Sequence, residues 1–306
     1  MEGGRIAASD FAGSDEAIGE FGMTGPTSDS EVVLDPEIPA VAYAIGLLQT
    51  DGSHEGDLDR KGRISLELAI RDESVLTQLA EALPCYSSIG HRSRATNFAA
   101  CSETATLRFY DRATRRAFAE LGVIVGRKAT KIRPPLTPFA EADYLRGLLD
   151  GDGSIGFTGK GEPFVSFVTA SPLAAEFFCR VVRNVCGVER SFRPNRRDGV
   201  ANVMVLNHAA ARLAAWAWYS PDVIGVDRKR AIAARVARWT PPPEKAGRYG
   251  ALRKPWTAAD DGIVLEFGSA EAAELLGRTV SSVSARRWRL RNGAARLCGL
   301  PQSLGA

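Results

Sequence analysis

Two aspartates are the residues of this chain whose type and spacing most directly suggest chemistry. They are Asp51 and Asp152, and they occupy the same position in two copies of one pattern, AYAIGLLQTDGS at 42–53 and DYLRGLLDGDGS at 143–154. The copies share G-L-L-x-x-D-G-S in full, and the two aspartates are 101 residues apart. A repeat of this kind indicates an internal duplication. Paired carboxylates contributed by two similar halves could bind a divalent cation.

Each copy is expected to form a helix that ends at its Asp-Gly-Ser. In the first copy Gly46 and Thr50 are four residues apart, and the second copy has glycines at both equivalent positions. Such stripes of small residues allow two helix backbones to approach closely, which would bring Asp51 and Asp152 together at adjacent C-terminal ends. The helix dipoles and the mutual repulsion disfavour two carboxylates there, and a magnesium ion with oxygen ligands would remove both penalties. The alternative is that Asp-Gly-Ser only ends a helix and opens a turn.

A matched pair of lysines follows the two aspartates. Lys128 lies 77 residues after Asp51, and Lys229 lies 77 residues after Asp152. A lysine near a pair of carboxylates can stabilise negative charge that develops during a reaction. The alternative interpretation is the solvated basic start of a helix, but the equal offset in both halves favours the catalytic role.

The segments around these residues predict an α+β fold in which each half reads helix, strands, helix, strands, helix. Apolar residues from Ile64 to Ile70 alternate with polar ones, which is typical of a strand with one buried and one solvated face, and Arg71 continues the solvated face. The other expected elements are a helix at 73–83, a basic loop at 91–94, strands at 104–110, 164–169 and 201–206, a helix at 172–186 and a basic turn at 193–197.

Composition divides the chain into six parts. The first 40 residues hold nine acidic residues and one basic residue, and three consecutive prolines begin at Pro241. Low apolar content and high net charge favour a flexible segment, whereas consecutive prolines form a stiff linker. The expected parts are an acidic leader at 1–37, duplicated halves at 38–138 and 139–240, a linker at 241–251, a module of three helices at 252–292 and a tail at 293–306.

Charge and residue usage narrow the classes of function. The chain of 306 residues has a formal net charge of +3. Residues 1–40 carry a charge of −8, so residues 41–306 carry +11. Of the 39 basic residues 32 are arginine, the side chain best suited to bidentate contacts with phosphate and guanine. A polyanionic partner is therefore expected, although arginine is also abundant in proteins from GC-rich genomes.

Cysteine and histidine usage excludes several kinds of site. The five cysteines form no C-x-x-C pair, and the three histidines are far apart in the sequence. A disulfide scaffold, a zinc ribbon and a site built on clustered imidazoles are therefore not expected. No apolar stretch approaches the roughly 18 residues that a membrane span needs, and the N-terminal segment lacks the features of a signal peptide.

The duplicated segments resemble the LAGLIDADG homing endonucleases in their single-chain, two-motif form. The second copy, LRGLLDGDG, is close to the family pattern, whereas the first, AIGLLQTDG, departs from it at Gln49, where the family usually has an acidic residue, and at Thr50. The eighth motif position carries the metal-binding acid of the family, and it is intact in both copies as Asp51 and Asp152. The resemblance covers about residues 40–239.

This resemblance implies a fold and a mechanism. It implies two pseudosymmetric αββαββα halves whose strands form a saddle over the major groove of double-stranded DNA. Asp51 and Asp152 would hold magnesium, helped by the main-chain carbonyls of Thr50 and Gly151, and metal-activated water would attack the scissile phosphates. The two lysines match the basic residue of the family near each active centre.

Arginines on the expected solvated faces and turns are the candidates for DNA contacts. Phosphate contacts position a protein on DNA, whereas contacts with base edges give sequence specificity. A single arginine on the outer face of a strand is more often only solvated. The candidates in the two halves are Arg63, Arg71, Arg92, Arg94, Arg193, Arg196 and Arg197.

The C-terminal module resembles Myb/SANT-like modules. The resemblance rests on WTAAD at 256–260 and LGRTVSSVSARR at 276–287. Three short helices are expected, with Thr279 as the N-cap of the third, and this pattern suggests helix-turn-helix recognition of DNA. The alternative is a basic surface helix that binds protein. The candidate DNA-binding residues of the third helix are Arg286, Arg287 and Arg289.

The sequence thus predicts a monomeric, site-specific double-strand DNA endonuclease that uses magnesium and acts in the cytoplasm at the nucleoid. One alternative is a DNA-binding transcription regulator that has lost cleavage on the same fold. The paired aspartates argue against it, because a protein that only binds DNA gains nothing from two adjacent acids. A second alternative is an intron RNA maturase, which the sequence alone does not separate from the nuclease.

Overall fold

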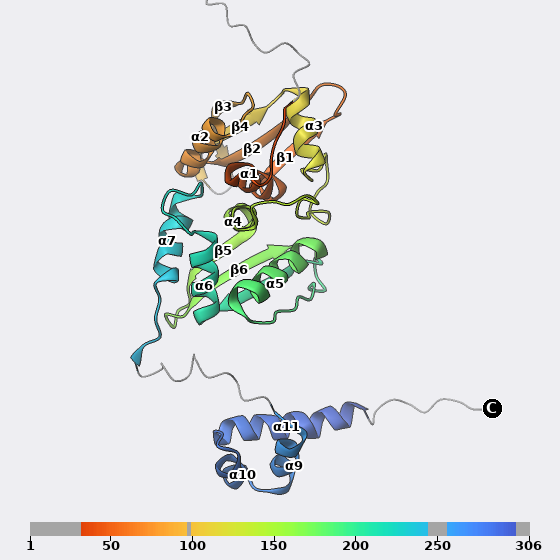
Figure 1. The fold of residues 1–306 in the computed structure, drawn as a ribbon, viewed down its shortest axis with the longest axis vertical. Coiled ribbons are helices and arrows are strands. Elements are labelled where there is room, and N and C mark those ends of the chain that lie inside the picture. Colours follow the sequence, from red (N-terminus) through yellow and green to blue (C-terminus); the bar gives the residue numbers. More distant parts are fainter. Residues whose placement is uncertain (1–31, 97–98, 244–255, 298–306) are drawn as a thin grey trace, which may run out of the picture. The chain divides into compact units, whose positions relative to one another are not determined.

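The computed structural model of the chain describes residues 32–96, 99–243 and 256–297, with the backbone alone at 94–102 and 293–297 where these are covered. It divides between Thr240 and Pro241 into two compact units, which are considered separately (Figure 1). Most of the expected acidic leader, linker and tail lies outside the described residues. None of the described helices is both long and apolar enough to cross a membrane.

The first half of the larger unit is a four-stranded antiparallel sheet with helices on one face (Figure 1). Its strand order is β1-β2-β4-β3, and helix α1 ends directly before β1. The elements are α1 (Pro39–Thr50), β1 (Gly52–Gly56), β2 (Gly62–Ala69), the 3-10 turn η1 (Ile70–Asp72), α2 (Glu73–Ala82), β3 (Ser88–Thr96), β4 (Ala99–Phe109) and α3 (Arg112–Glu120).

The second half follows the same order as far as α5 and then has, among its described residues, one strand fewer and one helix more. Its sheet is antiparallel with the order β5-β6-β7. The elements are α4 (Glu141–Asp152), β5 (Gly153–Phe157), β6 (Pro163–Thr169), α5 (Pro172–Cys186), β7 (Ala201–Leu206), α6 (Asn207–Ala217) and α7 (Asp227–Ala237). The α+β fold expected from the sequence is confirmed.

The strand that would correspond to β3 is replaced by an irregular connection between α5 and β7. Gly187 ends α5 with a positive φ of 68°, and Pro194 cannot donate a backbone hydrogen bond to a sheet. The side chain of Asn195 accepts hydrogen bonds from the backbone N–H groups of Arg197 and Asp198, which stabilises a turn at this point. The expected basic turn at 193–197 is therefore present.

Helices α1 and α4 lie side by side and join the two halves (Figure 1). They are in backbone contact at two equivalent glycines. A Cβ at Gly46 would collide with the carbonyl oxygen of Tyr144, and a Cβ at Gly147 would collide with that of Tyr43. This reciprocity is what a pseudo-twofold axis between duplicated halves requires, and the stripe of small residues makes the close approach possible.

Alternation along the strands places the core between sheets and helices. Ile64 and Leu66 of β2 are fully buried, but β2 ends at Ala69, and Ile70 is 37% exposed. Arg71 therefore lies in η1, and its prediction as part of a strand face was wrong, because the chain turns there to enter α2. The expected basic loop at 91–94 was also wrong, since these residues belong to β3 and pair with β4.

The smaller unit contains three helices within residues 256–297, namely α9 (Ala258–Glu266), α10 (Ser269–Leu276) and α11 (Val280–Leu297). A capping box of Thr257 and Asp260 begins α9. Thr279 Oγ1 accepts a hydrogen bond from Ser282 N at 3.2 Å and so caps α11, as expected. The helices enclose a small core of their own, formed by Val264, Ala272, Ala273, Leu276 and Val283.

The contact between α1 and α4 predicts a strong effect of adding one methyl group. We expect Gly147→Ala to lower the free energy of unfolding by about 2 kcal/mol or more, because its Cβ would lie 2.8 Å from Leu47 N and collide with the carbonyl of Tyr43. Chemical denaturation measures this change. Gly159→Ala is the matched control, since a Cβ there has nothing within 4 Å. Equal stability of the two variants would contradict the proposed helix contact.

Candidate active site and nucleic-acid interface

The two aspartates of the repeated motif lie where α1 and α4 end. Asp51 directly follows α1, and Asp152 is the last residue of α4. A Cβ built on Gly151 would collide with the side chain of Thr50 and lie 3.4 Å from Cγ of Asp51. The carboxyl group of the first motif is thus against the helix of the second. Both aspartates are exposed to solvent. The structure brings together the pair that the sequence singles out, at an accessible place.

Each matched lysine reaches the C-terminal end of the motif helix in its own half. Lys229 Nζ donates hydrogen bonds at 2.7, 2.7 and 2.9 Å to the carbonyl oxygens of Leu149, Asp150 and Gly153. Lys128 Nζ donates to the carbonyl oxygens of Leu48 and Gly52. A cation at this place offsets the negative end of the helix dipole. The lysines therefore support the helix ends that carry the aspartates.

Partial desolvation and neighbouring charges determine the protonation of this centre. Burial raises the pKa of Asp51, and the positive charges of Lys229 and Lys128 oppose that rise. Burial and then the charge of Asp51 raise the pKa of Asp152, so the two carboxylates are close enough to repel each other. Burial lowers the pKa of Lys128 to about 8. A divalent cation at the carboxylates would relieve this repulsion.

The donor set fits a magnesium ion that is shared with a substrate. Within the described part of the chain, no group of three or more His, Cys, Asp and Glu side chains could hold a metal ion. Two carboxylates suffice for magnesium, which is commonly bound by one or two carboxylates together with water and substrate phosphates. The carbonyl oxygens of Thr50 and Gly151, expected as further ligands, are not among those that the lysines bind.

The sixth motif position, which differs between the copies, has a structural role in this arrangement. Tyr144 Oη donates to Oε1 of the buried Gln49 at 2.7 Å, and Tyr43 Oη donates to Oδ2 of the buried Asp150 at 2.8 Å. Tyr43 and Tyr144 are equivalent in the duplication, so each half offers one tyrosine to the other. An acceptor oxygen is all that this pairing needs. Gln49 therefore takes the place that Asp150 has in the other copy without changing the exposed carboxylate pair.

The open face of the first sheet carries basic side chains. Arg63 on β2 and Arg92 on β3 are exposed, and Arg63 Nη2 pairs with Glu55 Oε2 at 2.8 Å. Arg108 on β4 is paired in register with strand residues on both sides and lies on the same face. The sequence interpretation missed Arg108. Its two neighbours on β4, Leu107 and Phe109, are apolar and buried, and this alternation could have revealed it.

Two of the expected DNA-binding arginines of this half lie elsewhere. Arg71 is in η1, where its side chain is 72% exposed and Nε lies 3.9 Å from Asp72 Oδ2. The backbone of Arg94 is part of β3 and pairs with Ser102. The side chain of Arg94 lies outside the described residues.

The second sheet presents a different surface. Its open face includes Val168 and Met204, which are 37% and 41% exposed. The three arginines of this half that the sequence predicts to bind DNA, Arg193, Arg196 and Arg197, are all exposed on the connection between α5 and β7. Arg197 Nη2 lies 3.1 Å from Asp198 Oδ2. The basic contacts available to this half therefore come from a turn and not from its strands.

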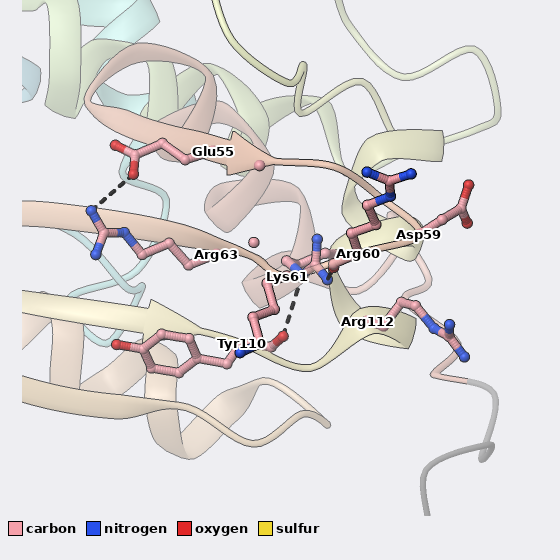
Figure 2. Close-up of a pocket in the computed structure, with 10 residues that line it drawn as sticks. Glu55, Asp59, Arg60, Lys61, Arg63, Tyr110 and Arg112 are labelled. Atoms are coloured by element: carbon pink, nitrogen blue, oxygen red, sulfur yellow. Dashed lines mark hydrogen bonds and ion pairs between the residues drawn. The ribbon is translucent and has the colours of Figure 1, made fainter.

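A hollow of about 790 Å³ opens at the turn between β1 and β2 (Figure 2). The buried Arg115 forms its support and donates hydrogen bonds to the carbonyl oxygens of Asp57, Arg60 and Tyr110. Arg60 and Lys61 are exposed on this turn, and both line the hollow. The sequence interpretation did not select them. They extend the basic surface of the first half.

In the smaller unit, two of the three predicted arginines contribute to packing. Arg286 makes two hydrogen bonds to the carboxylate of Asp261, at 2.7 and 2.6 Å. Arg287 donates to Val264 O, to Ser269 Oγ and to Phe267 O, so it ties α11 to the other two helices. Arg289 is exposed, as is Trp288 at 67%. Arg289 is thus the one of the three that is oriented toward solvent.

Comparison with known proteins finds distant structural likenesses. No protein-family model matches the sequence, and no curated protein matches it. The homing endonuclease I-WcaI bound to its DNA recognition sequence aligns at 13% identity and a TM-score of 0.43, over 59% of this chain and 80% of that one. The meganuclease I-SmaMI bound to uncleavable DNA aligns at 12% and 0.40, over 67% of this chain and 90% of that one.

A third solved structure covers more of the chain. Full-length DUF199/WhiA from Thermatoga maritima aligns at 12% identity and a TM-score of 0.39, over 84% of this chain and 92% of that one. All three likenesses are too distant for a function to be transferred from them. The function is therefore inferred from the residues of this chain.

The buried Asp150 predicts a specific dependence of stability on pH. Burial raises its pKa to about 6, so between about pH 4 and 6 the folded state binds a proton more tightly than the unfolded state. The free energy of unfolding must then fall, as far as this group contributes, when the pH rises through that window. Asp150→Asn removes the effect, so the variant gains stability relative to the wild type as the pH increases.

Denaturant unfolding at a series of pH values measures this difference. Asp198→Asn is the control, because hydrogen bonds, first that from Val200 N, lower the pKa of Asp198, and its effect is confined to below about pH 4. A constant difference between wild type and Asp150→Asn from pH 4 to 6 would contradict the prediction.

Proposed function

We propose that this protein is a site-specific double-strand DNA endonuclease. The observation that carries the proposal is the meeting of Asp51 and Asp152, each beside a lysine, at the adjoining ends of two helices related by an internal duplication. Two like charges at two negative helix ends are unfavourable unless a cation joins them. Two exposed carboxylates in one chain also match the need to cut two strands that lie close together.

The reaction is the hydrolysis of one phosphodiester bond in each strand. The oxygen of water attaches to phosphorus, the bond to the leaving sugar oxygen breaks, and the protons of water are shared between solvent and that oxygen. Magnesium, when bound, supplies an activated water and stabilises the leaving oxygen. Asp51 and Asp152 would hold it, with the main-chain carbonyls of Thr50 and Gly151. Lys128 and Lys229 hold the helix ends in place and add positive charge beside the scissile phosphates.

The chain is proposed to belong with the LAGLIDADG homing endonucleases of the single-chain, two-motif kind. Two halves that differ in sequence allow a monomer to bind an asymmetric target. The open faces of the two sheets would form the saddle that faces the DNA. The contacts with DNA are proposed to come from Arg63, Arg92, Arg94 and Arg108 on the first sheet, from Arg60 and Lys61 on the turn between β1 and β2, and from Arg193, Arg196 and Arg197 on the connection between α5 and β7. A DNA target in the cell places the protein at the nucleoid.

The smaller unit is proposed to be a Myb/SANT-like helix-turn-helix module that binds DNA beside the target. In support, α11 is capped by Thr279 and held against α9 and α10 by Arg286 and Arg287. This packing leaves Trp288, Arg289 and Arg291 exposed on α11. Phosphate contacts from these arginines would add affinity and increase the dependence of binding on salt.

The proposal predicts that both aspartates are needed for double-strand cutting. We expect Asp51→Asn and Asp152→Asn each to abolish it while DNA affinity changes little, because the amide keeps the size of the side chain but loses the charge that holds magnesium. The test uses magnesium-dependent digestion of a randomised duplex library, sequencing of the cut ends, and a binding assay with the selected target. Removal of divalent cations by a chelator should also stop cutting by the wild type. Robust cleavage by either variant would refute the mechanism.

The proposal also predicts separate roles for the two units. Deletion of residues 241–306 should weaken DNA binding more than it slows cutting at saturating enzyme, because each unit has its own core. Arg289→Gln together with Arg291→Gln should weaken binding and reduce the slope of log affinity against log salt by about 2 if both contact phosphates. Arg286→Gln is the comparison, since it should destabilise the module through loss of the Asp261 pair. Unchanged affinity after the deletion would show that the module is not a DNA reader.

A further inference from the structure

The first turn of α7 is tied to the opposite half of the larger unit. Asp72, which is 7% exposed at the end of η1, accepts hydrogen bonds from Nε and Nη2 of Arg228 at 3.1–3.2 Å. Beside this pair, Ser74 Oγ donates to Asp227 Oδ2 at 2.9 Å. Two adjacent residues of α7 are therefore fixed to the start of α2, across the boundary between the halves.

The next residue of the same turn is Lys229, which connects this contact to the centre. Its Nζ is bound to three carbonyl oxygens at the end of α4, and the residue is 8% exposed. A shift of the first turn of α7 would therefore move the ammonium group that binds the end of α4, where Asp152 lies.

The duplication provides a comparison, because the equivalent positions in the other half lack this contact. Asp72 directly precedes α2, and the residue in the same place before α5 is Ser171. Ser171 is uncharged, and its Oγ donates a hydrogen bond to Ile132 O at 2.5 Å, four residues after Lys128, so a neutral hydrogen bond stands where the first contact has an ion pair. The counterpart of Asp227 is Gly126. Arg127, the counterpart of Arg228, is exposed in a segment that is not helical. Lys128 therefore lies on an irregular segment, whereas Lys229 lies on a helix that is held from both sides.

We propose that the ion pair of Asp72 and Arg228 is a one-sided brace that positions Lys229, so that the two strand-cutting centres are unequal. Asp72 and Arg228 act as positioning residues through Lys229. Loss of the brace disturbs the cleavage of one strand more than that of the other. This inference rests on the proposed nuclease function, and its two measurements are chosen to separate the fate of the brace from that of the function.

The first measurement is the rate of cutting of each strand in a duplex whose two strands carry different labels, at saturating protein. In Asp72→Asn we expect cutting of one strand to slow on the order of tenfold, while the other stays within about twofold and DNA affinity is unchanged, so nicked duplex accumulates. Asp72→Glu restores the carboxylate and should recover most of the wild-type ratio of the two rates. Equal slowing of both strands, or no slowing of either, would overturn the proposal.

The matched control is Arg180→Gln. It removes an ion pair, 2.7 Å long, to Glu141, and both partners lie within the second half. The exposed fraction of Arg180 is similar to that of Arg228, whereas Glu141 is more exposed than Asp72. Its ratio of strand rates should equal that of the wild type. A changed ratio in this control would mean that any weakened ion pair alters the balance, which would overturn a specific role for the brace.

The second measurement needs neither metal nor DNA. Hydrogen–deuterium exchange of the free protein should show faster exchange in Asp72→Asn at the backbone amides of Lys229 and Arg230, which bond to Val226 O in the wild type. The segment around Lys128 should exchange at an unchanged rate. Unchanged exchange at α7 would overturn the brace even if the protein cuts DNA. If Asp72→Asn exchanges faster at α7 but the wild-type protein cuts neither strand, the result would support the brace and refute the proposed function instead.

Discussion

The backbone contact between α1 and α4 is the constraint on which the rest of the larger unit depends. Gly46 and Gly147 allow each helix to approach the carbonyl of a tyrosine on the other. That approach determines how far apart the halves are, and it brings the two helix ends and their aspartates together. A side chain at either glycine would separate the helices, and with them the carboxylate pair. Sheets and outer helices can tolerate small shifts, but this contact cannot.

Close approach at the centre has an electrostatic cost that other residues offset. The ammonium groups of Lys128 and Lys229 donate hydrogen bonds to carbonyl oxygens at the C-terminal ends of the two helices, where positive charge is most favourable. Between the helices, Tyr43 donates a hydrogen bond to the buried Asp150, and Tyr144 donates one to the buried Gln49. The charged lysines thus compensate the helix dipoles, while hydrogen bonds from the two tyrosines hold the polar groups buried between the helices. The exposed aspartates are the groups whose repulsion is left without full compensation, which is why a cation is expected there.

The halves are similar in order but not in surface. The first sheet has four strands and a basic open face with Arg63, Arg92 and Arg108, whereas the second has three described strands and exposes apolar side chains such as Met204. The ion pair of Asp72 with Arg228 likewise belongs to one side, whereas the other side has a neutral hydrogen bond from Ser171 to Ile132 O. Duplicated halves in one chain are free to diverge in this way, because each contact is encoded once. Such divergence suits a target whose two sides differ.

The sequence by itself determined the duplication and the α+β fold, because repeats and periodicity are local properties of the chain, and it predicted that Asp51 and Asp152 lie close together. It also indicated the ends of α5 and β7 correctly, since a cap or a run of alternating residues marks each of them. Only the tertiary structure decided that Arg71 lies in a turn, that residues 91–94 belong to a strand, and that Arg286 and Arg287 serve packing. Those outcomes depend on partners distant in sequence, such as β4 for Arg92 and Asp261 for Arg286. A charge pattern shows that a side chain is basic, but the fold decides whether it meets an acid, a carbonyl or solvent.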